Sequence, residues 1–196
     1  DRISGGISLW IAQHDGRSKD GNDITDPGLL KMLSLGGGPD IVKTLSALNI
    51  TPVAVSYEIE PCDILKVTES WKKKNQGFYI KSPGEDLVSI VTGITQYKGR
   101  VHITICPPIT EEELTPYSSL SPSLLLRKAA SLIDKRIYNG YRLFGTNYAA
   151  YDLLNGKALY KEYYTPDDLK ILTQREMLLK ERNESVLDSM TRMLRS

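Results

Sequence analysis

Apolar and polar residues alternate along the chain in a way that predicts strands and helices in turn. The apolar run Ile7–Gln13 predicts a strand that is buried on both faces, as in a parallel sheet. Two further strands are predicted at 51–57 and 101–106, where β-branched and aromatic residues recur. Apolar residues at helical spacing predict helices at 27–35, 39–48, 63–74, 85–97, 122–138, 148–154, 166–182 and 186–194. This order predicts an α/β fold with a mostly parallel sheet flanked by helices and a helical C-terminal extension.

Capping residues fix where two of these helices begin. Asp26 precedes Pro27, a residue favoured at the first helical position. Thr165 precedes Pro166 in the same way, with acidic residues following in the first turn. The predicted domains are an α/β portion at 1–117 and a helical extension at 118–196.

The composition is that of an ordinary globular protein. The chain has 196 residues, 40% of them hydrophobic and 25% charged, which argues against disorder. The net charge of +1 gives no overall field for nucleic acid, and no apolar run reaches the roughly 18 residues of a membrane span. Cys62 and Cys106 are predicted to be free thiols, although a pair between them stays open.

A polar turn follows the first predicted strand and contains Asp15, Gly16, Arg17, Ser18 and Lys19. Ligands of open α/β sheets bind at the ends of such strands. Glycine lets a backbone approach closely, and the planar fork of arginine binds two phosphate oxygens at once. The alternative is a loop arginine that pairs with Asp15 or Asp20, a kind of ion pair that is common and contributes little.

The order of the segments resembles the glycerolipid acyltransferase family of the lysophosphatidic acid acyltransferase type. Asp15–Ser18 matches the family block Phe-Pro-Glu-Gly-Thr-Arg-Ser, and Ile50–Val55 matches its later block of the form apolar-x-Pro-Val-apolar. A later predicted strand then ends in Pro107-Pro108. The chain departs from the family in having Asp15 for glutamate, no threonine before Arg17, and Gln13-His14 where Phe-Pro is usual.

The resemblance implies transfer of a fatty acyl group to a glycerol-phosphate or lysophospholipid acceptor. The donor would be acyl-CoA or acyl carrier protein, with no other cofactor and no metal. Asp15, Gly16, Arg17, Ser18 and Lys19 would bind the acceptor, with Arg17 on its phosphate. The implied location is cytoplasmic and peripheral at the inner face of the cell membrane, with the membrane surface as a partner and no nucleic acid.

The catalytic His-x4-Asp block of the family has no counterpart in this chain. The fifth residue after His14 is Lys19, and the fifth after His102 is Pro107. We therefore expect no catalytic residue in this chain, a catalytic pair in sequence that precedes it, and no activity of the chain alone. The alternative is a non-catalytic α/β binding or interaction module, for which no such pair is expected.

Two further residue groups admit more than one interpretation. Seven of the eleven tyrosines fall between Tyr138 and Tyr164, which suits an interface, a membrane surface or packing of the C-terminal helices. The run Lys72–Lys74 is favoured as a solvated helix end over a lipid contact.

Overall fold

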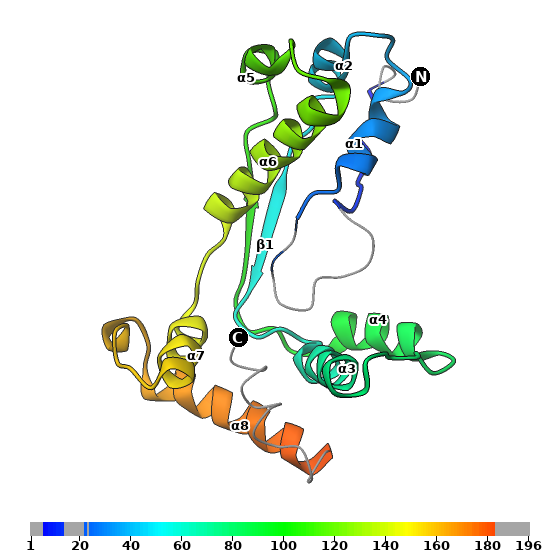
Figure 1. Cartoon of the computed structure of the whole chain (residues 1–196). Coiled ribbons are helices and arrows are strands. Elements are labelled where there is room, and N and C mark those ends of the chain that lie inside the picture. Colours follow the sequence, from blue (N-terminus) through cyan, green and yellow to red (C-terminus); the bar gives the residue numbers. More distant parts are fainter. Residues whose placement is uncertain (1–5, 14–21, 23, 183–196) are drawn as a thin grey trace. The chain divides into compact units, whose positions relative to one another are not determined.

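The computed structural model describes residues 6–13, 22 and 24–182, and within them the protein is mainly helical (Figure 1). Eight α-helices are present among these residues. They are α1 (Pro27–Ser34), α2 (Ile41–Ala47), α3 (Asp63–Gln76), α4 (Glu85–Thr95), α5 (Glu111–Leu114), α6 (Pro122–Gly140), α7 (Gly145–Asn155) and α8 (Pro166–Arg182). Two short 3₁₀ helices, η1 (Thr115–Tyr117) and η2 (Lys161–Tyr163), and two strands, β1 (Val53–Tyr57) and β2 (Val101–Ile105), complete the list. The helix predicted at 186–194 lies outside the described residues.

The predicted α/β fold with a mostly parallel sheet is wrong. The described residues form a single two-stranded sheet, and its strands run antiparallel. The Cys106 amide donates to Pro52 O at 2.9 Å at one end of the pair, and the Glu58 amide donates to Arg100 O at 2.9 Å at the other. Only the 51–57 and 101–106 predictions correspond to strands, each shortened by one or two residues.

The predicted first strand, Ile7–Gln13, is not a strand and is not buried. Trp10 is 79% exposed and Leu9 55%. Within the described part of the chain no strand pairs with this segment. An apolar run predicts burial only where neighbouring strands cover both of its faces, and here β1 has its partner in β2 instead.

Contacts along the chain define two compact units. Unit 1 comprises 1–55 and 103–141, and unit 2 comprises 56–102 and 142–196. The chain therefore changes unit within β1, again within β2, and once more after Tyr141. The predicted domain boundary between residues 117 and 118 stays a prediction.

Helix α6 is the centre of unit 1. Its buried residues recur at helical spacing and form one apolar stripe: Leu125, Leu126, Ala129, Ala130, Ile133 and Ile137. This stripe packs with Leu30 of α1, Leu45 of α2 and Leu114 of α5, each about 1% exposed or less. Helices α1 and α6 lie side by side (Figure 1), so the segment that precedes α1 is positioned by α6.

Small residues allow the end of α6 to approach the sheet closely. A Cβ added to Gly140 would lie 3.0 Å from Ala54 Cβ and 3.2 Å from Cys106 Sγ. Exposure alternates along strand β2, and it is the face with Val101, Ile103 and Ile105 that is exposed. The face with Thr104 and Cys106 packs inward, because only small side chains fit against α6.

Unit 2 is held by α3, α7 and α8. Ile64 and Val67 of α3 pack with the fully buried Leu179 of α8. Arg175 of α8 binds both carboxylate oxygens of Asp63, at the start of α3, with Nε 2.7 Å from Oδ2. Tyr148, Tyr151, Tyr160 and Tyr163 pack with ring centroids 5.0–6.1 Å apart, so these tyrosines contact one another.

Candidate functional site

The predicted acceptor residues Asp15, Gly16, Arg17, Ser18 and Lys19 lie outside the described residues, as does His14. The structure therefore does not test this assignment. It does describe the two ends of the segment that contains them, Gln13 and the residues from Ile24 onward.

These two ends meet at one anchored point in unit 1. The Asp26 amide donates to Gln13 O at 2.8 Å, which brings the two ends of the segment together. The neighbouring Thr25 is 2% exposed, and both its amide and its Oγ1 donate to Asp134 Oδ1 of α6, at 2.8 and 2.6 Å. A charged acceptor makes such hydrogen bonds stronger than neutral ones. Gln13 and Thr25–Asp26, which flank the segment that contains the predicted acceptor residues, are therefore held together at one point of unit 1.

Gln13 places a hydrogen-bond donor without an acceptor at this base. Its Nε2 is buried and has no hydrogen-bond partner among the described residues. A buried donor left unsatisfied costs about 1–3 kcal/mol, and such groups are rare in folded proteins.

A groove begins at the same base. It has a volume of about 700 Å³ and is formed by α1, the turn after it and the first turns of α6. Asp26 lines it, and its Oδ1 accepts from the Gly28 amide at 2.7 Å as the predicted helix cap. Leu35, Ile41 and Leu126 give the groove an apolar lining.

Two cations also line the groove, Lys31 from α1 and Arg127 from α6. Both side chains are exposed, and among the described residues neither makes an ion pair. An apolar lining beside two available cations suits an anion that carries a hydrocarbon chain.

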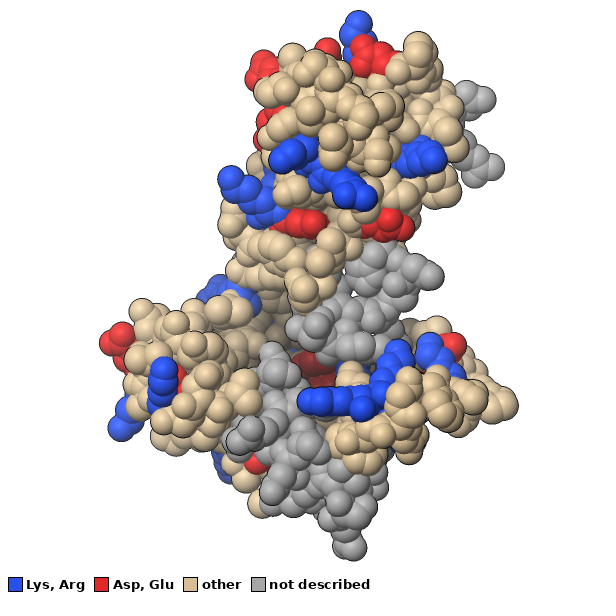
Figure 2. Space-filling view, in the orientation of Figure 1, with Lys and Arg blue, Asp and Glu red and all other residues tan. Residues whose placement is uncertain are grey.

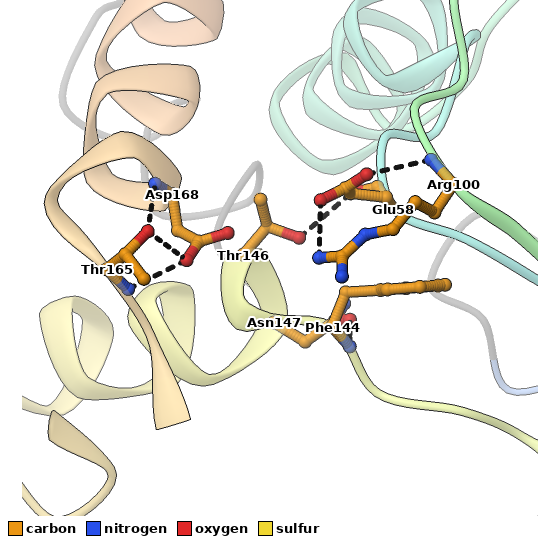
Figure 3. Close-up of polar contacts among 7 residues, drawn as sticks. All are labelled: Glu58, Arg100, Phe144, Thr146, Asn147, Thr165 and Asp168. Atoms are coloured by element: carbon orange, nitrogen blue, oxygen red, sulfur yellow. Dashed lines mark hydrogen bonds and ion pairs between the residues drawn. The ribbon is translucent and has the colours of Figure 1, made fainter. Parts of the chain in front are cut away.

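A second polar group lies in unit 2 and has a structural role (Figure 3). Glu58, at the end of β1, accepts from the Arg100 amide at 2.7 Å and from Arg100 Nη2 at 2.8 Å. These hydrogen bonds lower the pKa of the Glu58 carboxyl, while partial burial opposes them. The Arg100 guanidinium also lies 5.2 Å from the centre of the Phe144 ring, a cation–π contact.

Thr146 of α7 is bonded to this cluster, and the other residues of Figure 3 bond to one another at the starts of α7 and α8. Thr146 Oγ1 donates to Glu58 O at 2.8 Å, and the Phe144 amide donates to Asn147 Oδ1 at 2.8 Å. Thr165 and Asp168 bind one another at the start of α8, which confirms Thr165 as the cap. The carboxylates drawn there are already engaged by protein donors, so the cluster holds the fold rather than a ligand.

The two cysteines take no part in these groups. Cys62 and Cys106 are free thiols, as predicted, and both are buried. Cys62 Sγ donates to Ser89 O at 3.4 Å, and Cys106 Sγ donates to Arg136 O at 3.4 Å. In the part of the chain that the structure describes, no cluster of three metal-ligating side chains is found, and no helix is long and apolar enough to cross a membrane.

Sequence reasoning missed Lys31, Arg127 and Asp134. Lys31 and Leu35 are four residues apart on one predicted helix, so their spacing alone could have placed them on the same helix face. The pairing of Thr25 with Asp134 joins residues 109 positions apart, and no local pattern predicts it. Comparisons of the chain with protein-family models, with curated proteins and with solved structures gave no match.

Proposed function

We propose that this chain binds the acceptor in a glycerolipid acyltransferase, which transfers a fatty acyl group from acyl-CoA or acyl carrier protein to a glycerol-phosphate or lysophospholipid. Arg17 binds the acceptor phosphate, and Lys19 supplies a second cation. The protein works at the cytoplasmic face of the membrane, where such acceptors are found.

The observation that carries the proposal is the anchored base of the segment that contains Arg17. Hydrogen bonds from Thr25 to Asp134, and from Asp26 to Gln13, fix both ends of the segment at one point of unit 1. The described residues on both sides of the Arg17 segment are therefore held in place by unit 1. The buried Gln13 side chain adds Nε2, an N–H donor that could form a hydrogen bond to a phosphate oxygen.

The groove supports an acceptor that is both anionic and apolar. Lys31 and Arg127 suit a phosphate or its diester oxygens, and Leu35, Ile41 and Leu126 suit the start of an acyl chain. A lysophosphatidic acid combines these two chemistries in one molecule.

A non-catalytic interaction module is the second candidate. The observation in its favour is the mainly helical architecture, because the parallel sheet implied by the family resemblance is not found among the described residues. Under this alternative the cations of unit 1 have no preference for a phosphorylated lipid.

Calorimetry on this chain separates the two candidates. The probe is 1-hexanoyl-lysophosphatidic acid, with neutral monohexanoylglycerol as the comparison ligand. We expect binding of the phosphate-containing probe alone, and at least tenfold weaker binding by Arg17→Ala, which corresponds to a loss of about 1.4 kcal/mol.

Lys43→Ala is the matched control, since Lys43 is an exposed cation of α2 that does not line the groove. It should bind like the parent chain. Equal binding of the two ligands, or an Arg17→Ala chain that binds like the parent, would contradict the proposal and favour the interaction module.

A further inference from the structure

The groove of unit 1 carries charges of both signs. Asp26 lines it together with the two cations Lys31 and Arg127. All three residues are exposed, and among the described residues none of them makes an ion pair. Figure 2 shows acidic and basic side chains side by side over the region that Figure 1 labels α1 and α6. The acid and the two cations of the groove therefore stay available to a ligand instead of neutralising one another.

Asp26 uses only one of its two carboxylate oxygens to cap α1. Its Oδ1 accepts from the Gly28 amide at 2.7 Å, and no donor among the described residues binds its Oδ2. Asparagine and serine cap helices about as well as aspartate does, so the cap by itself requires an oxygen at this position but no charge. The negative charge and the second oxygen of Asp26 are thus left over once the cap is made.

The charges and the apolar lining of the groove together describe one class of ligand. Lys31 and Arg127 suit the two non-bridging oxygens of a phosphodiester. Leu35 and Leu126 suit the start of an acyl chain. A phosphate monoester would leave Asp26 beside an anion, which is repulsive. A phosphodiester whose head group ends in an ammonium gives each of the three charged side chains a group of opposite charge.

We propose that the acceptor is a zwitterionic lysophospholipid of the lysophosphatidylethanolamine type, with its head-group ammonium bound to Asp26. The inference rests on the proposed function, because Lys31 and Arg127 keep the acceptor phosphate and Asp26 adds the partner of the head group. An ammonium has three N–H donors, and Oδ2 accepts one of them while Oδ1 keeps its bond to the Gly28 amide. The groove, at about 700 Å³, has the size of a small-molecule site.

Calorimetry with a matched pair of lysolipids tests the assignment. The probes are 1-hexanoyl-lysophosphatidylethanolamine and 1-hexanoyl-lysophosphatidylglycerol, which share the phosphodiester and the acyl chain and differ in the ammonium. We expect the parent chain to bind the ethanolamine lipid about fivefold more tightly. This ratio corresponds to about 1 kcal/mol, which is within the range of an exposed ion pair.

Asp26→Asn removes the charge and keeps the cap, because the asparagine side-chain oxygen accepts from the Gly28 amide in the same way. This variant should bind the two lipids equally. It should also bind 1-hexanoyl-lysophosphatidic acid more tightly than the parent chain does, since an anion has been removed from the groove. The expected effects on the two kinds of ligand thus have opposite signs, which a general loss of structure would not produce.

Asp40→Asn is the matched control. Asp40 caps α2 by accepting from the Lys43 amide, is exposed, and does not line the groove. This variant should keep the fivefold preference for the ethanolamine lipid. Urea unfolding checks that Asp26→Asn and Asp40→Asn are as stable as the parent chain.

Three results would overturn the inference: equal binding of the two lipids by the parent chain, a preference that Asp26→Asn retains, or a weakening by Asp26→Asn that is the same for lysophosphatidic acid as for the ethanolamine lipid. The proposed function fails on a different observation, which is lysophosphatidic acid that binds no better than monohexanoylglycerol. A chain that prefers lysophosphatidic acid to monohexanoylglycerol but does not distinguish the two phosphodiesters would keep the proposed function and lose the head-group assignment.

Discussion

Thr25 anchors the chain just before α1 to helix α6. It is almost fully buried, and its hydroxyl and amide share one oxygen of Asp134. Thr25→Val keeps the shape of the side chain and removes the hydroxyl donor, so the half-buried Asp134 carboxylate loses one of its hydrogen bonds. We expect a loss of about 1–3 kcal/mol in the free energy of unfolding, measured with urea.

Thr95→Val is the matched control for this prediction. The Thr95 hydroxyl donates only within its own helix, to Val91 O, and the residue is exposed. Its replacement should change the free energy of unfolding by less than about 0.5 kcal/mol. Equal changes in the free energy of unfolding for Thr25→Val and Thr95→Val would show that the hydrogen bond to Asp134 stabilises the fold no more than an exposed one does.

Glu58 makes stability depend on pH. Its carboxyl pKa is lowered from an ordinary value of 4.5 by the hydrogen bonds from Arg100. A carboxyl whose pKa is lower in the folded state binds fewer protons there than in the unfolded chain. Its stabilising contribution is therefore complete above the unfolded pKa and is lost as the pH falls through the folded one.

Thermal unfolding of Glu58→Gln and of the parent chain tests this dependence. We expect the parent to have the higher melting temperature at pH 6–7, with a difference that shrinks as the pH falls below about 4. Glu162→Gln, at an exposed glutamate of η2, should show no such convergence. A difference that is constant between pH 7 and pH 3 would contradict the role of the ionised pair.

At the scale of the elements, the start of α7 depends on Gly145. A Cβ at this position would lie 2.4 Å from Asp168 Oδ2, and that carboxylate is held by the amide and hydroxyl of Thr165, each at 2.7 Å. Gly145→Ala should displace the Asp168 side chain and break the cap of α8. We expect a loss of about 1–2 kcal/mol in the free energy of unfolding.

A double-mutant cycle identifies the mechanism. If Gly145→Ala acts through the cap, then Gly145→Ala in an Asp168→Ala background should cost much less than it does alone. Gly36→Ala, at an exposed glycine with no atom within 4 Å of the added Cβ, is the control and should be nearly neutral. Full additivity of Gly145→Ala and Asp168→Ala would contradict the mechanism.

The helices were largely predictable because their signals are local. Asp26 before Pro27 and Thr165 before Pro166 mark the starts of α1 and α8, where the structure has them. The sheet was not predictable in the same way. Pairing of β1 with β2 is a contact between distant segments, and the apolar run Ile7–Gln13 resembles a buried strand whether or not neighbours cover it.

For the whole molecule, the two units explain why the overall architecture was mispredicted. Each unit is built from two separate stretches of chain, and strands β1 and β2 are each divided between the units. A sequence read in order gives alternating strands and helices, which suggests one layered domain. The pairing that decides the fold is set by long-range contacts, which alternation does not encode.

The groove of the candidate site was not predicted from the sequence. Asp15–Lys19 stay a prediction from residue type and order, whereas Lys31 and Arg127 reach one groove from helices that are about 90 residues apart in sequence. Lys31→Gln/Arg127→Gln should weaken binding of 1-hexanoyl-lysophosphatidic acid at least tenfold in calorimetry, because two charged hydrogen bonds to the ligand are lost. Binding equal to that of the parent chain would remove the groove from the site.

Acyl-transfer kinetics of the full-length gene product test the central claim most directly. If Arg17 binds the acceptor as proposed, Arg17→Ala should raise the Michaelis constant for a glycerol-phosphate acceptor at least tenfold, with kcat changed less than about twofold. An unchanged Michaelis constant in Arg17→Ala, or a protein that transfers no acyl group, would contradict the account.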